Sequence, residues 1–237
     1  MSDVIVRAAP TVAARTPWLG FLVMCAGMFM AILDIQVVAT SLPTIQHALG
    51  IATDQMIWIQ TAYLTAEIVA IPLTGYLTGL LGMRWLFVAA IGVFTIGSAG
   101  CAQAQAFHTL IAWRIVQGFA GGTLIPSVFA SVFLLIPPQR QGLATTIAGV
   151  AAVLAPTVGP IVGGWLTQTW SWHWLFRINI VPGIAAMVVG AVALRCEQAE
   201  RRARRAIDVW ALVALAVGLT CLELGLKDAP TQGWTAP

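Results

Sequence analysis

Three charged side chains interrupt long apolar runs in the first half of the chain: Asp34, Glu67 and Arg114. Arginine keeps its proton at any accessible pH, so a buried one needs a carboxylate, a water-filled cavity or a ligand. Each of these charges, left unpaired at the centre of a membrane, costs about 3 kcal/mol or more. Asp34 and Arg114 are therefore a candidate pair. Binding and release of a proton by the carboxylate is the chemistry that the pair could perform.

The pair has a second interpretation, because a static contact between Asp34 and Arg114 could simply fix how two helices pack. We favour the functional interpretation because ionisable groups inside a membrane more often mark ion or substrate pathways. For Glu67 three interpretations stay open. It could be a second proton site, a contact for a cationic substrate, or a residue that faces water in a wide vestibule.

The composition indicates a membrane protein. Of the 237 residues 59% are hydrophobic and 9% are charged, against about 25% charged in soluble domains, and the mean hydropathy is +0.88. The net charge is +3, but the basic residues lie in short connectors and not on one face, so no nucleic acid partner is expected. The four cysteines lack metal-binding spacing, and no HExxH or GxSxG motif is present, so neither a metal site nor an enzyme is expected.

Apolar runs of about 20 residues are long enough to cross a bilayer as helices. The sequence predicts seven of them, over residues 18–40, 56–79, 85–104, 109–136, 142–167, 175–195 and 208–226. The first run is too long for a typical signal peptide and contains Asp34, so we interpret it as a membrane span. The fold class is therefore an all-α polytopic membrane protein.

The arginines predict the orientation, because cytoplasmic connectors carry an excess of basic residues. A cytoplasmic N-terminus places nine arginines inside, namely Arg7, Arg15, Arg84, Arg140, Arg195, Arg201, Arg202, Arg204 and Arg205, against Lys227 outside. The chain then divides into a cytoplasmic tail (1–17), a six-helix bundle (18–195), a basic cytoplasmic loop (196–207), a seventh helix (208–226) and an outer segment (227–237).

The predicted spans place the charged residues at similar depths. At about 1.5 Å per residue, Asp34 and Arg114 lie about 10 Å and about 8 Å from the outer ends of their helices. Other polar or small residues share the helical faces of Arg114 and Glu67, which predicts an internal polar cavity. Its candidate substrate-cavity residues are Gln60, Tyr63, Gln117, Gly118 and Gly121.

The run 142–167 carries a stripe of small residues and prolines. Small residues let a second backbone approach closely, while proline weakens the hydrogen-bond ladder of its helix. The stripe therefore predicts a close but deformable seam, although ordinary tight packing explains it as well. Its members are Pro156, Gly159, Pro160, Gly163 and Gly164.

Several of these stretches together resemble the major facilitator superfamily, and within it the fourteen-helix drug:proton antiporters of the EmrB/QacA type. Residues 33–43 (LDIQVVATSLP) are similar to the first-helix LDxTVVNVALP motif, and Leu110, Arg114, Gln117 and Gly118 match the fourth-helix LxxxRxxQG motif. Residues 159–164 match the GPxxGG core of the fifth-helix antiporter motif, and residues 172–179 (WHWLFRIN) resemble the entry to the sixth helix.

The resemblance implies a six-helix N-terminal bundle built from two inverted repeats of three helices, followed by a seventh transmembrane helix. It implies a proton-coupled multidrug efflux transporter of the inner membrane, driven by the proton gradient without a cofactor, with hydrophobic drug-like substrates. Proton coupling would fall to Asp34 and Arg114, with Glu67 as a further candidate. A missing C-terminal bundle, a periplasmic adaptor and an outer-membrane channel are the implied protein partners. The alternative is a non-transporting scaffold or remnant that needs another polypeptide.

Two positions depart from the family pattern. The inner-loop motif GxLxDRxGRR corresponds here to Gly75 through Arg84 and includes Gly82, but Gly79 replaces the acidic residue. The gating salt bridge attributed to that loop therefore cannot form from this position. Ala155 stands where the fifth-helix motif usually has an upstream glycine.

Overall fold

The computed structural model describes residues 16–194, 214–222 and 225, and these form helices. The long elements are α1 (Thr16–Leu49), α2 (Thr53–Ala102), α3 (Phe107–Leu135), α4 (Gln141–Thr169) and α6 (Ile180–Ala193). Two short elements join them, the 3-10 helix η2 (Pro138–Arg140) and α5 (Trp174–Arg177). Five helical stretches of the described residues are long and apolar enough to cross a membrane, the last of which combines α5 and α6.

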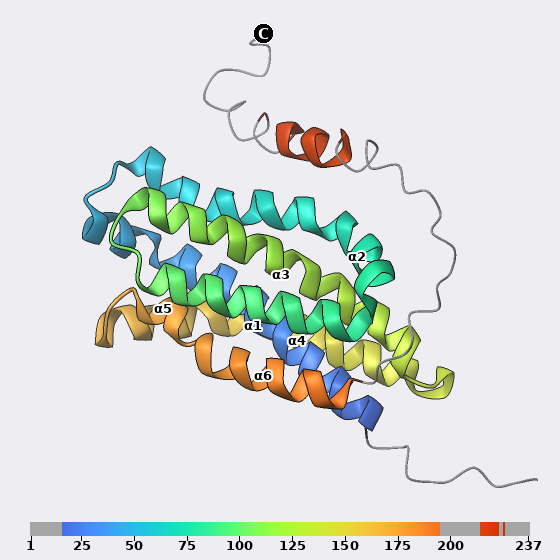
Figure 1. Cartoon of the computed structure of the whole chain (residues 1–237). Coiled ribbons are helices and arrows are strands. Elements are labelled where there is room, and N and C mark those ends of the chain that lie inside the picture. Colours follow the sequence, from blue (N-terminus) through green and yellow to red (C-terminus); the bar gives the residue numbers. More distant parts are fainter. Residues whose placement is uncertain (1–15, 195–213, 223–224, 226–237) are drawn as a thin grey trace, which may run out of the picture.

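Helix α2 contains the two helices predicted over 56–79 and 85–104, which follow each other without a connecting loop. Its 50 residues are interrupted at Gly82, whose φ of 76° and ψ of 156° are not helical. A positive φ is readily adopted only by glycine, so this residue lets the chain reverse without a loop. The two arms of α2 run in opposite directions (Figure 1). At about 1.5 Å per residue, each arm is long enough to be a span of its own.

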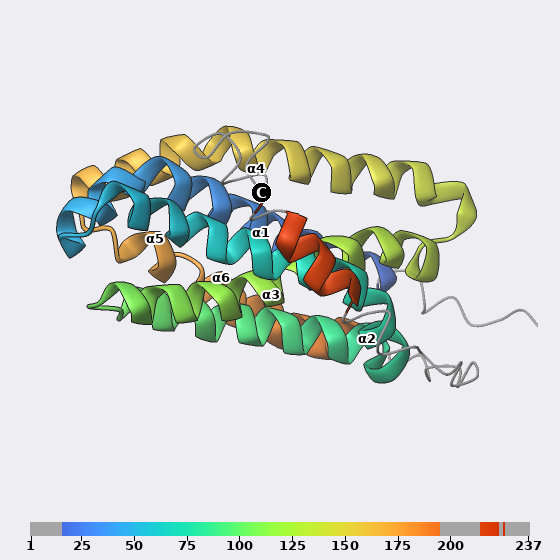
Figure 2. The same ribbon diagram turned by 90° about the horizontal axis from the view of Figure 1, so that it is seen from above.

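Helix α1 packs most extensively on α4 and also contacts α3 and α6 (Figure 2). It begins near the predicted boundary but continues to Leu49, well beyond the predicted end at residue 40, with Pro43 inside the helix. Two glycines of α4 allow the close contact. A Cβ at Gly159 would lie 2.4 Å from the Cβ of Gln36, and one at Gly163 would lie 2.9 Å from the carbonyl oxygen of Val37.

Helix α3 packs against both arms of α2. On the first arm, a Cβ at Gly118 would lie 2.2 Å from the carbonyl oxygen of Tyr63. On the second arm, a Cβ at Gly100 would lie 2.2 Å from the indole of Trp113. Helix–helix contacts in membranes are built by such small residues, because the surrounding lipid is as apolar as the side chains and close packing provides much of the attraction.

The last predicted span is described only in its central part. Residues 214–222 are helical, and the remainder of the predicted helix 208–226 lies outside the described residues except residue 225. The predicted tail to residue 15, the basic loop 196–207 and the segment 227–237 also lie outside the described residues. The part of the fold that positions the charged residues is therefore the six-span bundle of residues 16–194.

Candidate functional site

An ion pair joins α1 to α3 in the middle of the bundle. Nη1 of Arg114 lies 2.5 Å from Oδ2 of Asp34, and both side chains are fully buried. The sequence predicted that these two residues share a depth, and the contact confirms their proximity. Because the pair is enclosed by protein, removal of one partner would leave an uncompensated charge, which typically costs about 3–5 kcal/mol.

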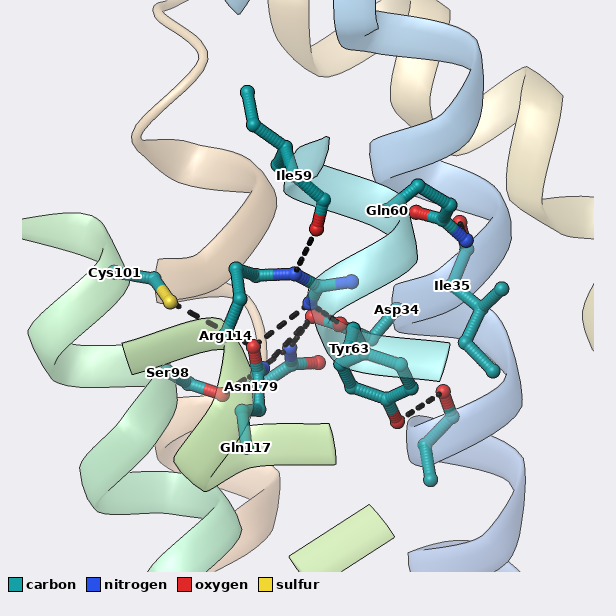
Figure 3. Close-up of polar contacts among 11 residues, drawn as sticks. Asp34, Ile35, Ile59, Gln60, Tyr63, Ser98, Cys101, Arg114, Gln117 and Asn179 are labelled. Carbon is teal, nitrogen blue, oxygen red and sulfur yellow. Dashed lines mark hydrogen bonds and ion pairs between the residues drawn. The ribbon is translucent and has the colours of Figure 1, made fainter. Parts of the chain in front are cut away.

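The second oxygen of Asp34 accepts hydrogen bonds from two amides (Figure 3). Nε2 of Gln117 donates at 3.0 Å and Nδ2 of Asn179 donates at 2.7 Å. Nε2 of Gln117 also donates to Oγ of Ser98 at 2.8 Å, and Oε1 of Gln117 accepts from Nη1 of Arg114 at 2.8 Å. Charge-assisted bonds of this kind stabilise the ionised carboxylate. One carboxylate therefore holds together side chains of α1, α3 and the start of α6.

Aromatic rings and a backbone carbonyl hold the other side of Arg114. Its Cζ lies 4.1 Å from the ring centroid of Tyr63 and 5.9 Å from that of Phe176. Its Nε donates to the carbonyl oxygen of Ile59 at 3.4 Å. A guanidinium that lies over a ring face is attracted by the negative electrostatic potential of that face. Arg114 therefore keeps partial stabilisation from Tyr63 even when the charge on Asp34 changes.

Glycines of α3 make room for Tyr63 and Glu67 of α2. A Cβ at Gly121 would lie 2.3 Å from the hydroxyl of Tyr63, and one at Gly122 would lie 2.5 Å from the carbonyl oxygen of Glu67. Gly118 and Gly122 are one turn apart, as are Tyr63 and Glu67. The two helices therefore cross with backbone against backbone, and Gly118 and Gly121 lie at this contact. Their assignment to a substrate cavity stays a prediction.

Glu67 is buried, with 7% of its surface exposed. Within residues 16–194 its carboxylate has no hydrogen-bond or ion-pair partner. Side chains four residues apart on a helix lie about 6 Å apart, so Glu67 is one turn from Tyr63, which contacts Arg114. A buried carboxylate without a partner is unusual, because an unpaired charge is costly to bury.

The described bundle also has an apolar cleft of about 610 Å³ between the two arms of α2 and α3. Trp58, Ala62, Val93, Ile111 and Phe119 are among its lining residues. None of the predicted cavity residues lines it. This cleft is therefore separate from the Asp34–Arg114 cluster.

Comparison with known proteins assigns the chain to a family. Residues 24–234 match the sequence model of the Major Facilitator Superfamily. The chain belongs to this superfamily. It is 38% identical over 224 residues to the colistin resistance protein EmrB of Acinetobacter baumannii and 32% identical over 206 residues to the multidrug export protein EmrB of Haemophilus influenzae. These alignments cover 94% and 87% of the chain but 44% and 40% of the two relatives.

Solved structures confirm the superfamily fold. The proton:xylose symporter XylE superposes with a TM-score of 0.69 at 15% sequence identity, over 89% of this chain and 54% of that one. At this identity the likeness concerns the fold alone. The chain is thus a multi-pass membrane protein of the superfamily, related to multidrug exporters and spanning less than half the length of the curated relatives it matches.

The predicted motif residues on α4 and at the inner loop make no hydrogen bond to Asp34 or Arg114. On α4, Gly159 and Gly163 contact α1, whereas nothing lies within 4 Å of a Cβ built at Gly164. Pro156 is half-buried and Pro160 is exposed. At the inner loop, Gly75, Gly79 and Gly82 all have open space beside them. The guanidinium of Arg84 lies 5.1 Å from the ring centroid of Trp85.

The site contains residues that sequence reasoning did not select. Asn179 is the last residue of the stretch 172–179 that resembles the entry to the sixth helix, and it binds Asp34 directly. Ser98, which accepts from Gln117, and Cys101, whose sulfur donates weakly to Oε1 of Gln117 at 3.7 Å, lie on the second arm of α2. The position of Asn179 inside a motif of the superfamily was the only signal that pointed to any of them.

Proposed function

We propose that this chain is the N-terminal half of a proton-coupled exporter of hydrophobic, drug-like compounds, with Asp34 and Arg114 as the coupling pair. The observation that carries the proposal is the fully buried ion pair, in which the carboxylate also accepts hydrogen bonds from Gln117 and Asn179. A pair that served packing alone could be replaced by apolar side chains of similar size, often without loss of stability. Relatives named for colistin resistance and multidrug export support the substrate class.

Protonation of Asp34 would change the balance of forces in the cluster. The neutral carboxyl no longer attracts the guanidinium, while Arg114 keeps its charge and must find other partners. The bundle is then biased toward the conformation in which Arg114 is best accommodated, and release of the proton restores the pair. A proton can shift the two conformations only to the extent that it binds them with different affinities.

The seam between α1 and α4 is the proposed route by which this change reaches the rest of the transporter. Gly159 and Gly163 contact α1 at Gln36 and Val37, which lie less than one turn from Asp34. Pro156 and Pro160 weaken the hydrogen-bond ladder of α4 at the same level. A small rotation of α1 would therefore be passed to a helix that can deform.

The substrate pathway would lie between this bundle and a second, C-terminal one. Its contribution from this half would comprise the predicted cavity residues, with Glu67 as a second proton site or a contact for a cationic substrate. The excess of arginines in the predicted inner connectors supports a cytoplasmic N-terminus and a location in the inner membrane. In a cell with two membranes, a periplasmic adaptor and an outer-membrane channel would complete the export route.

Gradient-driven efflux tests the proposal. A complete transporter carrying this half is reconstituted in vesicles, and the extrusion of a fluorescent lipophilic compound is followed after a proton gradient is applied. Asp34→Asn keeps the shape of the side chain but cannot take up the proton. We expect it to lower gradient-driven efflux by about a hundredfold, which corresponds to about 3 kcal/mol of lost coupling.

Asp54→Asn is the matched control, because Asp54 lies exposed in the first turn of α2. It should transport at the wild-type rate. Wild-type efflux by the Asp34→Asn protein would refute the assignment of the coupling site. Absence of gradient-driven efflux from the unmodified transporter would instead favour a scaffold.

A further inference from the structure

Two buried polar atoms beside the ion pair lack hydrogen-bond partners in the described part of the chain: Nη2 of Arg114 and Oε1 of Gln60. Arg114 is fully buried, so Nη2 has no access to solvent. One atom is a donor and the other is an acceptor. Buried polar atoms are seldom left unpaired in native proteins, and the exceptions require an explanation.

Three hydrogen bonds place these two atoms in the same part of the bundle. Nε of Arg114 donates to the carbonyl oxygen of Ile59, the residue before Gln60. Nε2 of Gln60 donates at 3.4 Å to the carbonyl oxygen of Ile35, the residue after Asp34. Nη1 of Arg114 binds Asp34 itself. In Figure 3 the Nη2 atom points toward the side where Gln60 lies and away from Gln117 and Asn179.

The orientation of the Gln60 amide is fixed by its partner. The carbonyl oxygen of Ile35 can only accept, so the amide nitrogen must face it and the amide oxygen must face the other way. Nη2 and Oε1 make no hydrogen bond to each other. A single water molecule could satisfy both, because it can accept from Nη2 and donate to Oε1.

We propose that a buried water bridges Nη2 of Arg114 and Oε1 of Gln60, and that Gln60 is a positioning residue that holds Arg114 when Asp34 is neutral. This role rests on the proposed function, in which Asp34 gains and loses a proton. When the carboxyl is neutral, Gln117, the carbonyl of Ile59 and the ring of Tyr63 still contact the guanidinium. None of them accepts a hydrogen bond from Nη2, so the bridge supplies the missing acceptor.

The charged and titratable side chains around this bridge come from three helices. They are Asp34 of α1, Tyr63, Glu67 and Cys101 of α2, and Arg114 of α3. The ring of Phe176 from α5 and the amide of Asn179 close the far side of the cluster. Asp34 is the group in this set that is ion-paired to Arg114. Its neutralisation should therefore increase the contribution of Gln60 to stability.

A double-mutant cycle on the complete transporter tests this dependence. Gln60→Met removes the amide with little change in size, and Asp34→Asn mimics the neutral carboxyl. The thermal midpoint of the purified protein is measured for both single variants and for the double variant. We expect Gln60→Met to lower the midpoint more in the Asp34→Asn background than in the wild-type background, since non-additivity reports coupled residues.

Thr61→Val is the control, because Thr61 lies beside Gln60 and its hydroxyl bonds only to its own helix at Ile57. Its effect should be the same in both backgrounds. Additive effects of Gln60→Met and Asp34→Asn would overturn the proposal. Unchanged stability of Gln60→Met in the Asp34→Asn background would also overturn it, and a higher KM for substrate would then leave Gln60 as a substrate contact alone.

The water itself can be observed directly. In an experimental map of the complete transporter that shows ordered waters in the bundle, we expect density within about 3 Å of both Nη2 and Oε1. A map that shows other buried waters but none at this position would overturn the proposal. These readouts concern stability and structure, so they remain informative if efflux by Asp34→Asn shows that the proposed function is wrong.

Discussion

Nδ2 of Asn179 lies 2.7 Å from Oδ1 of Asp34 and donates a hydrogen bond to it. This bond ties the start of α6 to the middle of α1, across 145 residues of sequence. Together with the ion pair to Arg114, this bond means that a change in the charge of Asp34 alters contacts between α1, α3 and the start of α6.

Replacement of Asn179 should change how transport depends on pH. Asn179→Leu removes a donor that stabilises the ionised form of Asp34, and hydrogen bonds to charged groups contribute about 1.5–3 kcal/mol. The midpoint of the pH dependence of efflux should therefore move to higher pH by about one unit or more, at 1.36 kcal/mol per unit. Gln103→Leu, an amide bonded only to its own helix at Ala99, is the control. An unchanged midpoint in Asn179→Leu would contradict the role of this bond.

Two glycine substitutions should have opposite effects on stability. A Cβ at Gly122 would lie 2.5 Å from the carbonyl oxygen of Glu67, so Gly122→Ala forces α2 and α3 apart. Overpacking of this kind typically costs about 1–3 kcal/mol. Gly164 of α4 has nothing within 4 Å of its Cβ position, so Gly164→Ala should raise helix stability by up to about 1 kcal/mol. Thermal unfolding in detergent measures both effects, and a stabilising Gly122→Ala would contradict the close crossing.

Neutralisation of Glu67 should affect transport without loss of stability. No described residue pairs with this carboxylate, so Glu67→Gln breaks no ion pair and removes a charge that is costly to bury. We expect unchanged or higher thermal stability and reduced efflux. Loss of efflux for neutral and cationic compounds alike would indicate a proton site, whereas selective loss for cations would indicate substrate recognition. Unreduced efflux of both would exclude Glu67 from the mechanism.

His173, just before α5, should make the stability of the bundle depend on pH. Burial against its neighbours and then the charge of Arg177 lower the pKa of this imidazole below its ordinary value of 6.5. The unfolded chain therefore binds a proton more readily, and the contribution to stability is present above pH 6.5 and lost as the pH falls through the lower pKa of the folded state.

Thermal midpoints measured between about pH 7.5 and about pH 5 test this expectation, since the range brackets the ordinary histidine pKa. The decline toward acid should be smaller in His173→Gln, which does not titrate. Arg177→Gln should also reduce the decline, because it removes the repulsion by the neighbouring charge. An equally steep decline in His173→Gln would assign the pH dependence to other groups.

The sequence predicted the spans and the central pair because both follow from the bilayer. A span must be about 20 apolar residues long, and a charge inside one must find a partner, so hydropathy and depth were enough to place Asp34 beside Arg114. The continuation of α1 to Leu49 could not be predicted in the same way. Beyond the apolar run a helix no longer needs apolar residues, so hydropathy does not predict where it ends.

The other contacts of the site depend on how the helices pack, which the spacing of residues in the sequence does not show. Asn179 and Ser98 are neutral polar residues among apolar ones, and nothing in their spacing shows that they converge on Asp34 and Gln117. The sequence likewise did not show that Gly118 and Gly121 of α3 lie against the backbone and hydroxyl of Tyr63. Which helix a small residue faces is decided by the tertiary arrangement.

Proton release on substrate binding tests the central claim most directly. The complete transporter is purified in lightly buffered detergent solution at a pH where the unmodified protein responds, and a saturating drug is added. We expect release of up to about one proton per drug bound, since linkage requires a change in proton occupancy when the two ligands are coupled. Asp34→Asn should still bind the drug but change the pH no more than a blank does. An equal proton signal from Asp34→Asn would show that another group carries the proton.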